Sequence, residues 1–168
     1  MSHSTSNQYC IVRCGESWYA LPSTAVREVM VSPDVTPLPN TSSILHGIAH
    51  VNNEFLTITD PLLPDENGQK RGTDSQEERV RQLLVLASSD GYWGILVDEV
   101  AGLTDLGSTM QPNRTTDRHL HFIGNAVHKD NELRIVDTEA TYRAVMAEVK
   151  ANWQQSFRSF EMAQEAQP

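Results

Sequence analysis

The chain has 168 residues, enough for one domain or for two small barrels that share a core. It carries 13 basic and 22 acidic residues, a formal net charge of −9, which disfavours binding to nucleic-acid phosphates. No apolar stretch is long enough to cross a membrane, and the polar start MSHSTSNQ lacks the apolar segment of a signal peptide. We therefore expect a cytoplasmic protein that contacts neither nucleic acid nor membrane.

The first predicted element is a β-hairpin. Residues 9–14 and 18–21 are short apolar runs, and the glycine-containing sequence between them is typical of a turn. Cys10 and Cys14 fall on one face of the first strand, about 13 Å apart along it, which is too far for a disulfide. We expect two buried thiols rather than zinc ligands, because no second pair of ligands lies nearby at the required spacing.

The next predicted elements lead to a second hairpin. Residues 24–30 are expected to form one helical turn that enters a strand, and residues 41–46 to form a short helix that ends at Gly47. Residues 47–60, GIAHVNNEFLTITD, alternate in hydrophobicity on both sides of Asn52-Asn53. Asparagine tolerates positive φ, so we expect a two-residue hairpin turn there.

The middle of the chain changes in composition. Residues 64–81, PDENGQKRGTDSQEERVR, contain one apolar residue and are predicted to be a mobile loop between strands. Two more hairpins follow, formed by residues 82–87 with 93–98 and by residues 123–127 with 133–136. The many short strands bounded by turn residues predict an all-β barrel architecture.

The C-terminal segment is predicted to be a long amphipathic helix whose first turn Asp137 or Thr138 can cap. Its apolar residues recur at steps of three and four and form one stripe: Tyr142, Val145, Met146, Val149, Trp153, Phe157 and Phe160. Either the whole stripe packs back on the barrels, or the part beyond about residue 150, with Trp153, Phe157 and Phe160, contacts a second copy of the chain.

Three predicted strands end in aspartate, at Asp60, Asp98 and Asp137. Two such carboxylates can form an acid/base pair, and a small β-barrel hydrolase that uses them is the enzymatic alternative. The other interpretation is that each aspartate accepts backbone N–H groups where its strand turns, and the threefold repetition favours it.

Two histidine pairs are the candidate metal ligands, His46 with His50 and His119 with His121. The first pair straddles Gly47 and need not share a face. The sequence has neither a nucleophile elbow nor a phosphate-binding glycine loop. We therefore expect no catalytic residues, no cofactor and no metal site.

Seven segments, in order and with matching gaps, resemble those of the CheW-like chemotaxis coupling proteins. They are TAVREVM (24–30), VTPLPN (35–40), residues 47–60, GILVDEV (94–100), MQP (110–112), FIG (122–124) and LRIVD (133–137). The resemblance implies an all-β fold of two small SH3-like five-stranded barrels that share a core, followed by a C-terminal α-helix. It divides the chain into a CheW-like domain over residues 8–146, including the loop 64–81, and a helical extension over residues 147–168.

The resemblance also implies a non-catalytic scaffold in chemotaxis-like signalling. Such proteins couple methyl-accepting chemoreceptors to a CheA-type histidine kinase by binding the cytoplasmic tip of the receptor and the regulatory domain of the kinase. The receptor-binding residues that it implies are Val26, Glu28, Asn52, Val100 and Leu103.

The chain departs from the family pattern at the hairpin turn. Family members read Asn-Leu-Arg-Gly where this chain has His50-Val-Asn-Asn53, so Asn52 replaces the arginine that pairs with Glu28. Asn52 can still hydrogen-bond Glu28, but without charge attraction. Thr57 also replaces a family proline. These changes suggest an auxiliary or dimeric adaptor that has lost ordinary receptor binding, for example in a dedicated chemosensory pathway such as one that controls pili.

Overall fold

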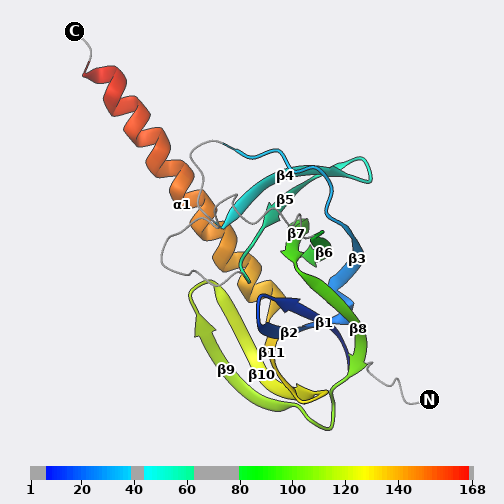
Figure 1. Ribbon diagram of the computed structural model, residues 1–168. Coiled ribbons are helices and arrows are strands. Elements are labelled where there is room, and N and C mark those ends of the chain that lie inside the picture. The colour runs from blue at the N-terminus through cyan, green and yellow to red at the C-terminus, as the bar shows by residue number, and fades with distance from the viewer. Residues whose placement is uncertain (1–6, 39–43, 63–79, 167–168) are drawn as a thin grey trace.

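The computed structural model describes residues 7–38, 44–62 and 80–166, in which two β-sheets are followed by one long α-helix (Figure 1). The first sheet has the strand order β8 (Glu99–Asp105), β1 (Gln8–Cys14), β2 (Ser17–Pro22), β11 (Asn131–Val136), β10 (Leu120–His128) and β9 (Gln111–Asp117). The second has the order β3 (Val26–Val31), β6 (Gln82–Ser88), β7 (Gly91–Val97), β5 (Glu54–Thr59) and β4 (Leu45–Val51). The predicted all-β fold with a C-terminal helix is confirmed, except that the first sheet has six strands rather than five.

The main core cluster takes side chains from both sheets. Cys10 and Cys14 of β1 are packed there with Leu84 of β6 and Trp93 of β7, all at most 2% exposed. The other face of β1 is also covered, since Ile11 belongs to a cluster with residues of β2 and β11. Burial on both faces explains why this strand reads as a continuous apolar run rather than an alternating one. Both cysteines are free thiols, as predicted.

The predicted turns are confirmed where the structure describes them. Asn52 and Asn53 have φ values of 49° and 64°, and Lys129 and Asp130, between β10 and β11, have 48° and 62°. Two successive residues with positive φ give the two-residue turn whose twist matches that of the flanking strands. A 3-10 helix, η1 (Ser23–Ala25), enters β3, as residues 24–30 predicted.

The predicted helix over residues 41–46 is wrong for its described part. Leu45 and His46 lie in β4, where Leu45 pairs with Thr59, while residues 41–43 lie outside the described ranges. Gly47 is therefore a strand residue, with φ of 155°, at a register shift of the β4–β5 pair. A Cβ on Gly47 would lie 2.2 Å from the Thr36 carbonyl oxygen, so close strand approach, not helix termination, requires glycine there.

The prediction of a mobile loop over residues 64–81 does not hold for Arg81. Its guanidinium donates to both carboxylate oxygens of Asp60, at 2.8 and 3.1 Å, and the Arg81 side chain is 21% exposed. Val80 is 69% exposed, and residues 63–79 lie outside the described part of the chain.

The C-terminal helix, α1 (Thr138–Glu165), is 28 residues long and continues past residue 146 without a break. Asp137 caps it by accepting a hydrogen bond from the Ala140 amide. The first turns pack on the body of the molecule, where Val145 is fully buried and the Tyr142 ring lies 5.3 Å from that of Trp93. In Figure 1 the later turns, coloured orange to red, extend away from the sheets.

Candidate functional site

The predicted receptor-binding residues begin with a polar contact that joins the two edges of the second sheet. Asn52, in the β4–β5 turn, donates a hydrogen bond of 2.8 Å from Nδ2 to the Glu28 carboxylate on β3. β3 and β4 are the outermost strands of this sheet. A neutral amide therefore fills the position at which the family resemblance places an arginine, and the bond lacks the attraction between opposite charges.

The predicted apolar residues lie where the two sheets meet. Val26 of β3 and Val100 of β8 are half-buried, and both pack against the main core cluster. The Val100 amide also donates to the side-chain oxygen of Gln82 at 2.7 Å, and Gln82 of β6 pairs with Val31 of β3. This hydrogen bond thus connects the start of β8, in the first sheet, to the β3–β6 edge of the second sheet.

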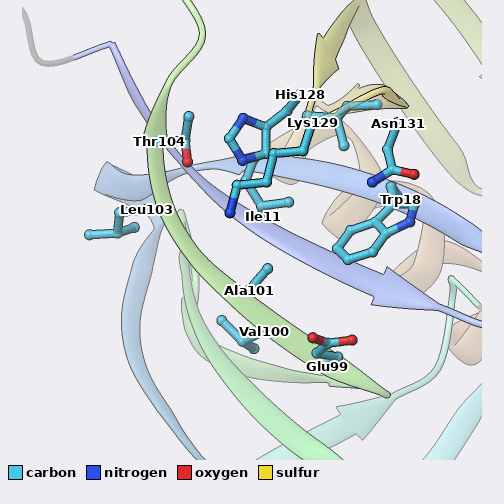
Figure 2. A pocket seen from close by; sticks show the side chains of 11 residues that line it. Ile11, Trp18, Glu99, Val100, Ala101, Leu103, Thr104, His128, Lys129 and Asn131 are labelled. Carbon is cyan, nitrogen blue, oxygen red and sulfur yellow. The ribbon is translucent and has the colours of Figure 1, made fainter.

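Leu103, farther along β8, is 60% exposed and lines a pocket of about 500 Å³ (Figure 2). Val100 and Ile11 also line this pocket, whereas Val26, Glu28 and Asn52 do not. The structure therefore divides the five predicted residues between the Glu28–Asn52 contact, the junction of the sheets and the β8 pocket.

The opposite wall of the pocket contains residues that the sequence did not single out. His128, Lys129 and Asn131 belong to the β10–β11 hairpin, and Figure 2 shows Lys129 extending from its turn toward β8. Nothing local in the sequence indicates this, because β8 and the hairpin are brought together only by their common neighbours β1, β2 and β11 in the sheet. The sequence predicted a hairpin of residues 123–127 with 133–136, but not the surface that its turn faces.

Two of the three strand-end aspartates share one cation. Arg81 binds Asp60, and its Nε lies 3.5 Å from Asp98. Burial lowers the pKa of Arg81, but the hydrogen bonds and charge of Asp60, with Asp98 behind them, raise it by more. Burial raises the pKa of the Asp60 carboxyl, against the opposing effect of Arg81. Arg81, Asp60 and Asp98 therefore form a buried structural ion-pair cluster, in which the guanidinium occupies both carboxylates.

The other contacts of these aspartates agree with the structural interpretation. Asp98 accepts the Gly15 amide at 2.6 Å, and Asp137 accepts the Ala140 amide at 3.1 Å. Asp137 thus binds a backbone N–H where its own strand ends, as predicted. Asp98 instead binds an amide in the β1–β2 turn, which is distant in sequence. The side chain of Asp60 instead binds Arg81, which the repeated pattern did not predict.

The two predicted histidine pairs lie in separate parts of the fold. His46 and His50 are exposed on β4, and the His50 ring lies 5.1 Å from that of Phe55. His119 pairs with Glu148 of α1, and Nδ1 of His121 lies 3.4 Å from the Thr116 hydroxyl. Among the described residues, no three His, Cys, Asp or Glu side chains are grouped as metal ligands.

The tail residues with predicted intermolecular contacts lie on the projecting part of α1. Trp153 is 51% exposed and Phe157 is 63% exposed. Phe160 lies within the helix, but its side chain is outside what the structure describes. No helix in the described ranges is both long and apolar enough to span a membrane.

Comparisons with known proteins agree on one family. The family model described as a CheW-like domain matches residues 8–146. Protein PilI from Pseudomonas aeruginosa is 32% identical over 92 residues, which are 54% of this chain and 48% of that protein. The chain thus spans about half the length of this curated relative. The crystal structure of the scaffolding protein TtCheW from Thermoanaerobacter tengcongensis matches with a TM-score of 0.64 and 20% identity, over 80% of this chain and 91% of that one.

Proposed function

The chain belongs to the CheW-like domain family, and from this membership we propose that it couples methyl-accepting chemoreceptors to a CheA-type histidine kinase. Membership supports a scaffold in chemotaxis-like signal transduction rather than an enzyme. The proposal adds the two partners, the cytoplasmic tip of the receptor and the regulatory domain of the kinase, and places the protein in the cytoplasm, where both are found. It also treats residues 8–146 as the functional domain.

One observation carries the receptor part of the proposal. Val26 and Val100 are half-buried against a common core where the two sheets meet, and Leu103 is exposed farther along β8. On this proposal the three side chains form one apolar surface. A helix can lay one apolar stripe along such a surface. The Glu28–Asn52 contact supplies a polar rim beside it.

The test is a binding measurement with a matched pair of surface variants. Leu103→Asp introduces a charge on the proposed surface, and Val127→Asp introduces the same charge on β10, where Val127 is 56% exposed. We expect Leu103→Asp to weaken binding of a purified receptor tip by about tenfold or more, as for an apolar anchor, and Val127→Asp to leave it unchanged. Equal affinity of the two variants would contradict the assignment of the surface.

Kinase coupling is tested separately with the isolated regulatory domain of the kinase. We expect the wild-type chain to bind it with a Kd in or below the range of about 10–50 µM, which is typical of modest interfaces. Absence of binding to both partners at these concentrations would reject the coupling function.

A second candidate is an auxiliary adaptor that keeps the kinase and has weakened receptor binding, and the neutral Asn52–Glu28 bond favours it. On this hypothesis, Asn52→Arg should strengthen binding of the receptor tip several-fold by giving Glu28 a charged partner. Asn53→Arg is the matched control, because position 53 has the same left-handed backbone. If Asn52→Arg and Asn53→Arg behave alike, the charge at position 52 does not control receptor binding.

A further inference from the structure

We propose that two copies of this chain pair through the projecting half of α1, in antiparallel orientation. The inference rests on the helix alone, so it can hold or fail independently of receptor and kinase binding. It defines the orientation of the contact with a second copy that the apolar stripe beyond about residue 150 suggests.

The first observation is an apolar face without a covering. Trp153 and Phe157 are four residues apart, so they lie on one side of the helix, and they continue the stripe that Tyr142 and Met146 bury against the main core. From Trp153 to Glu165, every side chain whose exposure the structure describes is exposed. Paired large aromatic residues on a bare helix are typical of an interaction surface, since each can bury about 150–250 Å².

The second observation is a self-complementary charge pattern beside that face. Lys150 and Glu161 are about three helical turns apart and therefore lie on the same flank of the stripe. Within the described part of the chain, neither side chain has an ion-pair partner. The opposite flank has the uncharged residues Asn152, Ser159 and Ala163.

A second copy of the chain fits this pattern only in one orientation. When two identical helices pair antiparallel about a twofold axis, like flanks meet, and each contact occurs twice. An axis near residue 155 places Trp153 against Phe157 of the second copy and brings Lys150 beside its Glu161. The last turn of each copy, beyond Glu161, then reaches the level of Met146, where the body covers this face, and must bend away from it. Parallel pairing would place both charges against the uncharged flank.

The net charge of the chain favours the same orientation. Each copy carries −9, and antiparallel pairing holds the two bodies at opposite ends of the joined helices, where their mutual repulsion is smaller. The contact spans only the last few turns of α1 and is smaller than a standard protein interface, so the dimer should be weak and concentration-dependent.

Sedimentation velocity of the full chain, from about 10 µM to about 500 µM, covers the affinity range of such an interface. We expect the wild-type mass to rise toward that of a dimer, and Trp153→Ser to weaken association by about tenfold or more. A wild-type chain that stays monomeric over this range would overturn the proposal. The proposal would also be overturned if Trp153→Ser lost binding to the kinase domain while the mass measured by sedimentation did not change.

Charge exchange tests the orientation. Lys150→Glu and Glu161→Lys should each weaken self-association, because each places like charges together at both ends of the antiparallel contact. An equimolar mixture of the two single variants should associate again as a heterodimer, and the double variant Lys150→Glu/Glu161→Lys should recover as a homodimer. If these changes do not alter the strength of self-association, the dimer is parallel or forms through the body of the molecule, and the proposal is wrong. The altered side chains are exposed, and circular dichroism of each variant checks that the fold is retained.

Discussion

Arg81 acts on the residue scale as a buried link between the ends of two strands. Its guanidinium contacts Asp60, which follows β5, and Asp98, which follows β7, and the Asp60 and Asp98 side chains are 6% and 7% exposed. Removing the cation would leave two buried carboxylates without their counter-charge. Such a loss typically costs more than the intact pair contributes.

We therefore expect Arg81→Met to lower the free energy of unfolding by about 3 kcal/mol at pH 7. The double variant Asp60→Leu/Arg81→Met should lose less, because it removes the nearer carboxylate as well. Since burial already raises the pKa of Asp60, the deficit of Arg81→Met should grow as pH rises through that pKa and shrink toward about pH 4. Urea unfolding at several pH values measures this. A deficit of the single variant that does not change with pH would show that Asp60 is not the group left unpaired.

Cys14 is a second residue whose environment determines its chemistry. Burial raises the pKa of its thiol to about 12, opposed by the hydrogen bond of the sulfur with the Asp98 backbone, whereas the charges of Asp60 and Asp98 add to the rise. The thiolate is the reactive form, so native Cys14 should resist Ellman's reagent at pH 8, while unfolded protein reacts at both cysteines. The pKa of Cys14 in the folded protein exceeds its value of about 8.5 in the unfolded chain. The stability that the buried neutral thiol contributes is therefore fully present below about pH 8.5 and is lost as pH rises toward 12. Cys14→Ala should remove this part of the alkaline loss, and rapid native labelling of Cys14 would contradict its burial.

Gly47 shows on the element scale how one residue permits an extended segment to approach the edge of a strand. The amide of Ile48 donates to the Thr36 carbonyl at 2.9 Å, and the amide of Thr36 donates to the Ile48 carbonyl at 2.8 Å. This pair attaches the extended segment after β3 to the free edge of β4. A side chain at position 47 would occupy the space of the Thr36 carbonyl.

We expect Gly47→Ala to cost at least about 2 kcal/mol, because it combines positive φ with this overlap. Gly91→Ala is the matched control, since Gly91 has φ of 122° with no atom within 4 Å of an added Cβ. It should cost the conformational strain alone, about 1 kcal/mol. Thermal unfolding of both variants measures the difference. Equal losses would show that the strand approach at Thr36 relaxes without penalty.

The elements that the sequence predicted are those with a local signal. The Asn52-Asn53 turn, the buried strands and the capped helix follow from turn chemistry, apolar runs and helical periodicity. β9 has none of these signals, because all of its residues are exposed and it is held by pairing with β10. The helix expected at residues 41–46 is wrong over its described part, residues 44–46, for a related reason, since long-range pairing of Leu45 with Thr59 overrides local propensity.

The candidate site was predicted less completely than the fold. The hydrogen bond that Asn52 can still form with Glu28 is present. The far wall of the β8 pocket was not foreseen, since His128 and Lys129 reach it through sheet order rather than through any motif. Sequence patterns specify which residues face inward, but the neighbours of a surface depend on non-local strand pairing.

At the scale of the whole molecule, α1 has an anchored half and a free half. Thr141 and Val145 are fully buried, and Glu148 pairs with His119. Removing residues 151–168 should therefore leave the thermal unfolding midpoint within about 2 °C of wild type while abolishing self-association. Deletion from residue 138 onward is the comparison, because it uncovers the main core and should destabilise the fold severely. A large loss of stability on removing only residues 151–168 would mean that the tail supports the body.

The order of strands along the chain has a consequence for biosynthesis. The five strands of the second sheet are consecutive in sequence, so they can assemble as soon as they leave the ribosome. β1 and β2 are made first, but β2 must wait for β11, whose Leu133 pairs in parallel with Trp18, and β1 must wait for β8. During translation this early hairpin has two unsatisfied edges and exposed apolar faces, which makes the nascent chain a candidate substrate for chaperones until its last strand emerges.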